Sequence, residues 1–427
     1  MSVTPAARRA ASTDWAHMSP ILAARLPAGL ADVVVYPGTP EQITTAVRLA
    51  HRYGVPITPR GQGTGNYGQG IPLANGLVID TSRCNRVLSI GDGWIRAQPG
   101  TSFTTLEAAA HTHGQELAIL PSTVGSTIGG FIAGGSGGTG SIENGWTWDG
   151  YVQALDLVPC TDEAAVTTFE GASCEPFHHA YGVTGLIGTA TVTLVPRRDW
   201  TALFAAFTSE PAAVHAARRL MRMDPPPRIV SLDEPGIVAT YPDDPAMPPG
   251  KHSVRAVIDR STHTSAATVI TDCGGTVEAI RPKAAAYLAS LSFNHVTHRA
   301  RKARPELCHL QVAGDALTER ADDVRAVLPG TLLHLDGFRT HPPKGTDPRA
   351  GRELVGMLLC RFEDAHRLYE GVTRLRRLGV LVDDPHTWLL HHNLDRIREA
   401  ALRFDPGGLL NPGKLPPSGN RRARPES

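Results

Sequence analysis

Residues 125–141 read Gly-Ser-Thr-Ile-Gly-Gly-Phe-Ile-Ala-Gly-Gly-Ser-Gly-Gly-Thr-Gly-Ser. Eight of the sixteen positions from Gly125 to Gly140 are glycine, and the run shows neither helical nor strand periodicity. Glycine weakens both regular structures, so a cluster this dense needs another cause. One cause is close approach of the backbone to an anion or a flat ring, with N–H groups pointing at the ligand. The apolar residues Ile128, Phe131 and Ile132 favour ordered ligand contact over a flexible linker.

The composition is that of a globular, two-domain protein. Of the 427 residues, 41% are hydrophobic and 19% charged, and the formal net charge is +1. Such a balance gives no reason to expect binding to nucleic acid or to an anionic membrane. No apolar run approaches the roughly 20 residues of a membrane helix, and no secretory signal is expected. The six cysteines are scattered, which predicts reduced thiols in a cytoplasmic protein.

A second glycine-rich stretch lies nearer the N-terminus. Residues 31–59 predict a strand, a helix capped by Thr39 and starting at Pro40, and another strand. That strand runs into Pro-Arg-Gly-Gln-Gly-Thr-Gly-Asn-Tyr-Gly-Gln-Gly at 59–70, with five glycines in twelve residues. The loop lacks the Gly-Lys-Ser/Thr ending of a triphosphate-binding loop, and a strand at 76–80 follows it instead of a helix. It therefore predicts an anion-binding loop of neither the Walker nor the Rossmann kind.

Further elements follow from periodicity and caps. Strands are predicted within 87–99, at 152–159 and at 185–196, and a helix at 101–113. The middle of the chain mixes both types and lacks the glycine motifs. There we expect helices at 212–223 and 363–378 and strands at 254–259 and 352–360, followed by a helix at 394–404.

Four motifs occur in an order that resembles a known family. They are Pro59-Arg60-Gly61-Gln62-Gly63-Thr64, the stretch 121–130 (Pro-Ser-Thr-Val-Gly-Ser-Thr-Ile-Gly-Gly), the stretch 182–190, and Asp405 to Lys414 with Asn-Pro-Gly-Lys at its end. Together they resemble the vanillyl-alcohol oxidase superfamily of FAD-linked oxidoreductases, also called the p-cresol methylhydroxylase (PCMH) type. The resemblance covers about residues 30–200 and 400–415.

The resemblance implies an α+β fold with a two-part FAD-binding domain and an inserted cap. The expected bounds are 28–198 for the FAD-binding domain and 199–395 for an α+β cap built on an antiparallel sheet. Residues 396–415 would return to the FAD-binding domain, and 416–427 would form a disordered tail.

The resemblance also implies which residues contact FAD. The first loop would wrap the pyrophosphate, the second stretch would pass the flavin ring and ribityl chain, Gly185 and Ile187 would lie by the adenine, and Asn411 and Lys414 would close the site. Backbone N–H groups without a Cβ in the way suit two adjacent phosphates. The implied set is Pro59, Arg60, Gly61, Gln62, Gly63, Thr64, Gly65, Asn66, Gly70, Pro121, Ser122, Thr123, Gly125, Ser126, Thr127, Gly129, Gly130, Gly134, Ser136, Gly185, Ile187, Asn411 and Lys414.

The chain departs from the family pattern at three places. Many relatives carry a histidine at the position of Thr64 that bonds covalently to the flavin, and no cysteine lies between Leu117 and Val124 for a second link. We therefore predict non-covalent FAD. The usual Gly-Ile-Val-Thr is Gly185-Leu186-Ile187-Gly188 here, which weakens the adenine assignment.

The residues that would act on the substrate are sought among the histidines of the cap and C-terminal part. The stretch from His334 to His341 includes Asp336 and Arg339, and strand alternation would put His334 and Asp336 on one face. His391 and His392 precede the returning helix. Alternatively, each of these histidines is an ordinary surface residue or a hydrogen-bonded core residue. His295 and His298 are expected on the face of a helix. Trp146, Trp148 and Tyr151 would line the pocket or pack in the core. No metal site is expected, because the His334–Asp336 pair lacks further ligands.

The sequence thus predicts an FAD-dependent oxidoreductase that takes a hydride from a small organic donor. The expected donor carbon is CH–OH, in an alcohol or hydroxy acid such as those of secondary metabolism, and oxygen or another acceptor would take the electrons. The alternatives are a phenolic or amine donor, an NADPH-fed reductase, and a flavin-fold binding module without turnover. The substrate, the catalytic base and the oligomeric state stay open.

Overall fold

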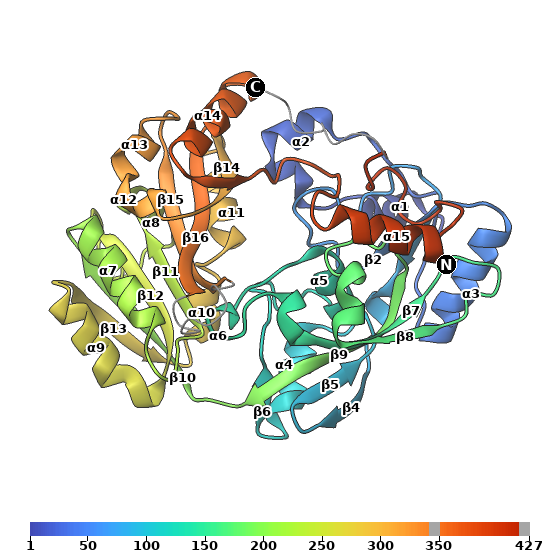
Figure 1. Cartoon of the computed structure of the whole chain (residues 1–427), viewed down its shortest axis with the longest axis horizontal. Coiled ribbons are helices and arrows are strands. Elements are labelled where there is room, and N and C mark those ends of the chain that lie inside the picture. The colour runs from blue at the N-terminus through green and yellow to red at the C-terminus, as the bar shows by residue number, and fades with distance from the viewer. Residues whose placement is uncertain (341–350, 418–427) are drawn as a thin grey trace. The chain divides into compact units, whose positions relative to one another are not determined.

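The computed structural model describes residues 1–340 and 351–417 (Figure 1). His341 and the end of the expected tail, from residue 418, lie outside the described residues. The chain divides into two compact units, and each is discontinuous in sequence. The first contains residues 1–137, 146–197 and 386 onward, and the second contains 138–145 and 198–385.

The first unit begins with a short parallel sheet. Its strands, in the order β1 (Val33–Val35), β3 (Leu77–Asp80), β2 (Ile57–Arg60), are joined through helix α3 (Pro40–Arg52). Thr39 caps α3, Pro40 stands at its first position, and Ile43, Val47 and Ala50 are buried. Before this sheet come α1 (Pro5–Ala11), the 3-10 turn η1 (Trp15–Met18) and α2 (Pro20–Arg25).

A second, antiparallel sheet completes the first unit. Its order is β4 (Val87–Gly91), β5 (Trp94–Ala97), β9 (Leu186–Pro196), β7 (Val152–Val158), β8 (Thr167–Glu170), and β6 (Gln115–Leu117) also pairs with β9. Helix α4 (Phe103–His111) and the returning helix α15 (Leu394–Phe404) contribute to the same core, through Phe103, Leu106, Ala400 and Phe404. The short turns are η2 (Thr81–Arg83), the π-helical η3 (Thr147–Tyr151) and η4 (Gly171–Phe177).

The glycine run contains a helix that its composition does not suggest. Helix α5 (Ile128–Gly134) starts at the cap residue Thr127 and buries Ile128, Phe131 and Ile132. Our expectation of no helical structure in this run was wrong, because three apolar anchors and a threonine cap outweigh the helix-weakening glycines. The anchors do show that the run is ordered rather than a linker.

The second unit is built on one antiparallel sheet of eight strands. Their order is β13 (Thr276–Pro282), β10 (Trp200–Phe207), β12 (His252–Asp259), β11 (Ile229–Asp233), β15 (Leu332–Arg339), β16 (Arg352–Arg361), β14 (Leu307–Ala313), β17 (Leu381–Asp383). Helices α7 (Glu210–Met221) and α9 (His263–Asp272) pack against it. The other helices are α6 (Ser141–Asn144), α8 (Pro235–Val238), α10 (Ala285–Ala289), α11 (Asn294–Ala303), α12 (Ala316–Glu319), α13 (Ala321–Arg325), α14 (Ala365–Arg377) and the turn η5 (Arg260–Thr262).

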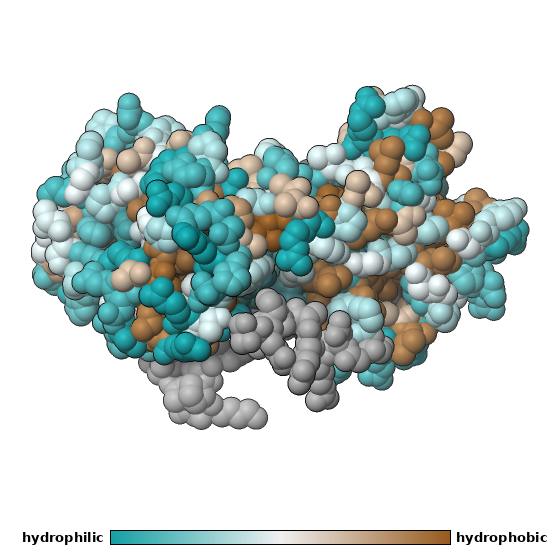
Figure 2. Space-filling model, turned by 90° about the horizontal axis from the view of Figure 1, so that it is seen from above, coloured by the Kyte–Doolittle hydropathy of each residue, from teal (hydrophilic) through white to brown (hydrophobic). Residues whose placement is uncertain are grey.

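The mixed helix-and-sheet class and the antiparallel sheet of the inserted part are confirmed. Hydrophilic and hydrophobic residues are intermixed on the face shown in Figure 2. In the described part of the chain, no helix combines the length and apolar character needed to cross a membrane.

Candidate functional site

The two glycine-rich stretches lie against each other in the first unit. A Cβ atom at Gly61 would stand 2.1 Å from Thr127 Oγ1, so only glycine allows the first loop to come this close. Thr127 caps α5, and its hydroxyl accepts the Gly130 N–H at 3.3 Å. The N–H of Gly129 donates to the Pro99 carbonyl at 2.9 Å, and a Cβ there would also clash with Pro99. The contact that the resemblance requires between these stretches is therefore present.

The C-terminal Asn-Pro-Gly-Lys segment joins the same place. Asn411 is 1% exposed and has a left-handed backbone, with φ of 43°. Its N–H donates to the Ile57 carbonyl of β2 at 2.6 Å. Its side-chain Nδ2 donates to the Gln69 carbonyl at 2.9 Å and to the Tyr181 carbonyl at 2.8 Å. One amide thus ties the first glycine loop to a third loop.

The third loop, residues 178–185, packs on the other two. The N–H groups of His179 and Tyr181 donate to the carbonyls of Ile132 and Ala133 in α5, at 2.9 and 2.8 Å. A Cβ at Gly182 would stand 2.3 Å from Pro59 Cγ. All four sequence motifs therefore meet in one region. Gly185 lies against Leu157, and Ile187 is buried in the core of this unit.

Some atoms of this region face open space or lack a partner. A Cβ at Gly125 or Gly134 would meet no atom within 4 Å, so packing within the protein does not require glycine at these two positions. Within the described residues, the buried atoms Ser126 Oγ, Arg60 Nη1 and Asn411 Oδ1 have no hydrogen-bond partner. Buried polar atoms without partners are uncommon, which points to a bound group that supplies them.

The remaining expected cofactor contacts belong to the same unit. They are Gln62, Gly63, Thr64, Gly65, Asn66, Gly70, Pro121, Ser122, Thr123 and Ser136.

Lys414 places a charge next to the first loop. Its side chain is fully buried, and its Nζ donates to the Gly68 carbonyl at 2.5 Å. Burial lowers the pKa of Lys414 to about 7, although the charge of Asp14 acts to raise it. A cation held beside peptide N–H groups suits an anionic ligand.

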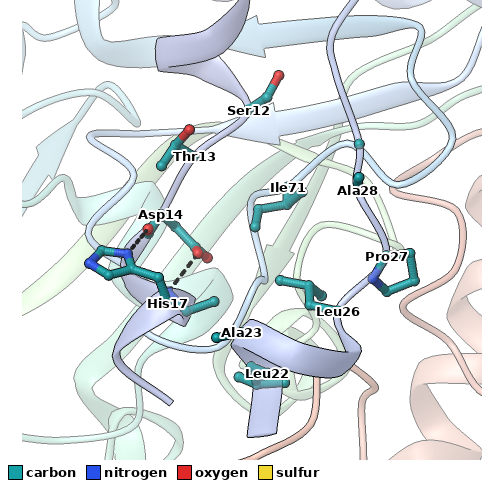
Figure 3. Close-up of a pocket in the computed structure, with 12 residues that line it drawn as sticks. Ser12, Thr13, Asp14, His17, Leu22, Ala23, Leu26, Pro27, Ala28 and Ile71 are labelled. Atoms are coloured by element: carbon teal, nitrogen blue, oxygen red, sulfur yellow. Dashed lines mark hydrogen bonds between the residues drawn. The ribbon is translucent and has the colours of Figure 1, made fainter. Parts of the chain in front are cut away.

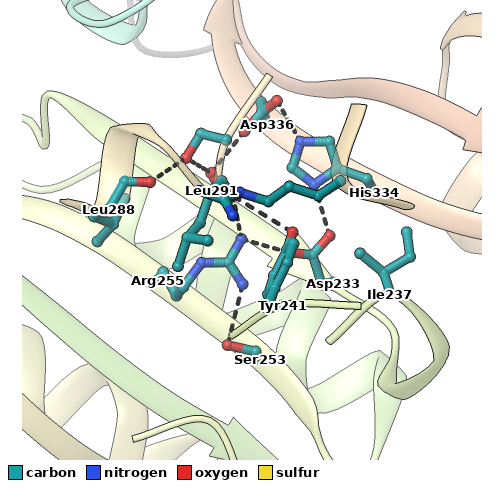
Figure 4. A network of polar contacts seen from close by, with 12 residues as sticks. Asp233, Ile237, Tyr241, Ser253, Arg255, Leu288, Leu291, His334 and Asp336 are labelled. Atoms are coloured by element: carbon teal, nitrogen blue, oxygen red, sulfur yellow. Dashed lines mark hydrogen bonds and ion pairs between the residues drawn. The ribbon is translucent and has the colours of Figure 1, made fainter. Parts of the chain in front are cut away.

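The second unit contains a fully buried charge cluster (Figure 4). His334 contacts a carboxylate through each ring nitrogen, Asp233 through Nδ1 and Asp336 through Nε2, both at 2.7 Å. Asp233 also accepts from Arg255 Nη2 and from the Tyr241 hydroxyl. Burial alone would lower the pKa of His334, but Asp336 and Asp233 outweigh it and raise that pKa to about 10.

The cluster uses both nitrogens of His334. His334 and Asp336 do lie on the same face of β15, as strand alternation predicts. However, an imidazolium with both N–H groups donating to carboxylates has no lone pair to accept a proton. Asp336 is equally occupied, since it also accepts from the Ser231 hydroxyl and the Phe293 N–H.

The other three residues expected to act on the substrate are not members of this cluster. Arg339 ends β15 and is paired with Arg352 of β16. His391 and His392 are exposed residues of the first unit, and His392 stacks on Trp148 with ring centroids 5.2 Å apart. Trp148 stacks in turn on Trp146 at 5.6 Å. Of the five candidate residues, His334, Asp336 and Arg339 belong to the second unit, and His391 and His392 belong to the first.

Comparison with known proteins identifies the first unit. Residues 31–167 match the family model described as "FAD binding domain". The chain is 25% identical to the glycolate oxidase subunit GlcD of Bacillus subtilis over 423 residues, which cover 90% of this chain and 88% of that protein. Residues 31–167 thus form an FAD-binding domain, and these matches fit the PCMH-type FAD-linked oxidoreductases that the sequence motifs resemble. The cofactor of the chain is FAD, as the sequence motifs predict.

Other relatives of this flavoprotein match over shorter stretches. An uncharacterized FAD-linked oxidoreductase of Mycobacterium tuberculosis is 34% identical over 111 residues, which is 26% of this chain and only 24% of that protein. The D-lactate dehydrogenase of Archaeoglobus fulgidus is 29% identical over 205 residues, 45% of this chain and 46% of that one. A solved alkyldihydroxyacetonephosphate synthase shares the fold, with a TM-score of 0.74 at 16% identity, covering 97% of this chain and 82% of that one.

The region where the four motifs meet fits FAD. The pyrophosphate would take N–H groups of the loop from Gly61 to Gly70 and charge from Lys414, which suits two adjacent phosphates. Gly125, Ser126 and Gly134 would lie along the rest of the cofactor. When bound, FAD supplies the acceptor for the two electrons of the oxidation.

Several residues of these sites were not predicted from the sequence. In the first unit, Asp14 and Tyr181 contact the first loop, and Gly68 of that loop accepts a hydrogen bond from Lys414. In the second unit, Asp233 and Arg255 complete the charge cluster. The run Ser12-Thr13-Asp14 is a helix-cap signal, but nothing local connects it with residue 65. Asp233 and Arg255 are 22 positions apart on paired strands, so only the register of β11 and β12 reveals them.

Proposed function

We propose that this flavoprotein oxidises a small 2-hydroxy acid at its CH–OH carbon, with non-covalently bound FAD. The observation that carries the proposal is the meeting of the four FAD motifs around unpartnered buried atoms. The substrate class follows from two relatives, whose names are glycolate oxidase subunit and D-lactate dehydrogenase. Thr64 cannot form the covalent flavin bond of histidine, which supports the non-covalent mode.

The chain's own residues would bind the acid and handle its proton. A guanidinium pairs well with a carboxylate, so Arg339 is the proposed partner of the substrate's acid group. His391 or His392 is the proposed proton acceptor, because imidazole side chains are the usual general bases of enzymes near neutral pH. His334 and Asp336 would instead keep the second unit in shape, since their polar atoms are committed to the cluster.

The test is anaerobic reduction of the flavin by candidate substrates. Purified protein is mixed without oxygen with D-lactate, L-lactate, glycolate, a simple alcohol, a phenol, an amine or NADPH. The proposal predicts bleaching of the flavin by a 2-hydroxy acid and return of the colour when oxygen or a dye acceptor is admitted. Bleaching only by NADPH, by a phenol or by an amine contradicts it, and no bleaching by any of these compounds favours a binding module.

A variant pair tests the role of Arg339. Arg339→Met should raise KM for the hydroxy acid about tenfold or more, the usual loss for a charged hydrogen bond. Arg361→Met removes an exposed arginine from the neighbouring strand β16 and serves as the control. Equal KM values in the two variants would remove Arg339 from the substrate site.

A further inference from the structure

The segment before the matched FAD-binding domain contacts the first glycine loop. The family model begins at residue 31, so residues 1–30 are outside it. Nevertheless, Arg60 Nη2 donates to the carbonyls of Ala10 and Thr13, at 3.1 and 2.7 Å. The N–H of Trp15 donates to the Gly65 carbonyl at 2.8 Å. Three hydrogen bonds therefore join residues 10–15 to both ends of the turn at 60–65.

These bonds fix the shape of the loop. The guanidinium of Arg60 lies over Gly63, where a Cβ would stand 1.9 Å from Nη2. Gly63 itself has φ of +66°, a conformation that favours glycine. Since Arg60 Nη2 binds residues 10 and 13, this face of the loop is already covered by protein. Nη1 of Arg60 is buried without a partner among the described residues, so a ligand could accept its hydrogen bond.

Asp14 adds a buried charge at the same place. Its carboxylate is 6% exposed, and Oδ1 accepts the Ala16 N–H at 2.9 Å. Oδ2 lies 3.7 Å from the position of a Cβ at Gly65. Burial raises the pKa of Asp14, while the N–H groups of Ala16 and Gly68 and the charges of Lys414 and Arg60 oppose this. The charges of Lys414 and Arg60, which border the loop, therefore favour the ionised form of Asp14.

The far end of the segment is also anchored. Ser19 Oγ and His386 Nδ1 are 2.8 Å apart, and both residues are buried. Ala16 and Leu22 form a small core with Ile71, against which Leu26, Tyr67 and Trp388 pack. A cavity of about 240 Å³ is lined by residues of the segment, among them Asp14 and His17, and by Leu22, Leu26 and Ile71 (Figure 3).

We propose that residues Ala10 to Ser19 are a strap that holds the loop Gly61–Gly70 in its FAD-binding shape. The proposal rests on the proposed function only in taking FAD as the ligand of this loop. Trp15, through its N–H, and Asp14 are then positioning residues, because they act on the loop rather than on the cofactor. A preformed loop loses less conformational freedom on binding and releases its ligand more slowly.

Trp15→Pro is the sharpest test, because compared with Trp15→Ala it replaces the N–H that bonds the Gly65 carbonyl with a ring CH2 group. Trp15 is the first residue of η1, where proline is tolerated, and Asp14 has the extended backbone that precedes proline well (φ −131°, ψ −162°). The matched variant is Trp15→Ala, which loses the half-exposed indole but keeps the N–H. Both full-length proteins are loaded with FAD and diluted, and the return of free flavin fluorescence gives the release rate.

The strap predicts that Trp15→Pro releases FAD at least about threefold to tenfold faster than Trp15→Ala, because it loses one hydrogen bond and its ring pushes the Gly65 carbonyl away. It also predicts faster amide hydrogen exchange in residues 61–70 of the FAD-free Trp15→Pro protein. A merely structural role would lower the melting temperature of Trp15→Pro and leave both quantities unchanged. Equal release rates and equal exchange in the two variants would overturn the strap. If the unaltered protein takes up no FAD, the proposed function fails, and the exchange comparison still decides on the strap.

Discussion

At the residue scale, Gly61 is the position with least freedom to change. Its missing side chain lets the first loop touch Thr127, and a Cβ would stand 2.1 Å from the threonine hydroxyl. We predict that Gly61→Ala weakens FAD binding about tenfold or more, since forcing extra volume into a packed contact costs roughly 1–3 kcal/mol. Titration of the FAD-free protein with FAD measures this. Gly38→Ala, whose Cβ would make only an ordinary contact with Gln42, is the control, and equal affinities would contradict the prediction.

Gly63→Val is expected to lose FAD as well, for a reason that differs from the one the sequence suggests. The sequence predicts that the added side chain would fill a phosphate-binding nest. In the structure a Cβ at Gly63 first meets the guanidinium of Arg60, and φ of +66° is strained for a branched residue. We predict that the purified variant is colourless. A variant that stays yellow would remove this loop from the site.

Lys414 makes the stability of the FAD-free protein depend on pH. Burial lowers its pKa from the ordinary 10.5 to about 7, so the folded state disfavours the charged form. The cost is present in full below pH 7 and is lost as the pH rises toward 10.5. We predict that the free energy of unfolding, relative to that of Lys414→Met, rises between pH 7 and 10. Urea unfolding at several pH values measures it, and a flat or falling difference would count against a buried, strained lysine.

Whether a site residue can be predicted from the sequence depends on whether its contacts come from neighbouring positions in the chain. Gly61, Gly63 and Thr127 stand in motifs whose chemistry is visible in a few adjacent letters. Asp14 stands in no such motif, because Gly65 and Lys414 come near it only when the chain folds. The sequence did predict the pair of His334 and Asp336, but the second carboxylate, Asp233, comes from another strand. Because both ring nitrogens are bound, we propose for His334 a structural role in place of the expected catalytic one.

At the scale of elements, the turn at Asn411 connects three segments. Its side chain bonds the carbonyls of Gln69 and Tyr181, and its backbone continues β2 through Ile57. Asn411→Gly keeps the left-handed backbone but removes both side-chain bonds. We predict a loss of about 2 kcal/mol in the free energy of unfolding, from two hydrogen bonds of about 1 kcal/mol each. Asn75→Gly, in an exposed left-handed turn where the side chain accepts one hydrogen bond from the Leu30 N–H, is the control and should lose less stability. Equal losses would contradict the proposed role of the Asn411 side chain.

The buried cluster joins strands β11, β12 and β15. Asp233 is fully buried between Arg255 and His334, which together lower its pKa to about 2 despite the opposing effect of burial. We predict that Asp233→Asn lowers the free energy of unfolding by about 3–5 kcal/mol, because it leaves two buried cations short of a partner. Asp199→Asn removes a mostly exposed partner of Arg260 and should cost less than about 1 kcal/mol. Urea denaturation compares them, and similar values would contradict the cluster's role.

Helix α5 shows where prediction of elements from sequence fails. Its glycines lower the summed helix propensity more than its apolar residues raise it. The helix forms nevertheless, because Phe131 and Ile132 are buried by the rest of the unit. By contrast, α3 and α15 were predicted within a few residues, since each carries its own apolar stripe and end signals. Helix α5 thus depends on burial by distant parts of the chain, which the sequence does not show, whereas α3 and α15 depend on their own local signals.

At the scale of the whole molecule, each unit is built from segments that are separated in the sequence. The first unit takes its N-terminal strap, its glycine loops and its C-terminal turn from sequence positions up to 400 residues apart, and the inserted sheet forms the second. The resemblance predicted this nesting from the order of the motifs. It gave no reason to place residues 1–27 or 138–145, because no family motif covers them.

The central claim is that four separated motifs make one FAD site. The most direct measurement is the visible spectrum and flavin content of the purified full-length chain, before and after incubation with FAD and removal of the excess. The account predicts a yellow protein with close to one FAD per chain, released intact by acid because the link is non-covalent. A protein that remains colourless after incubation with FAD would contradict it.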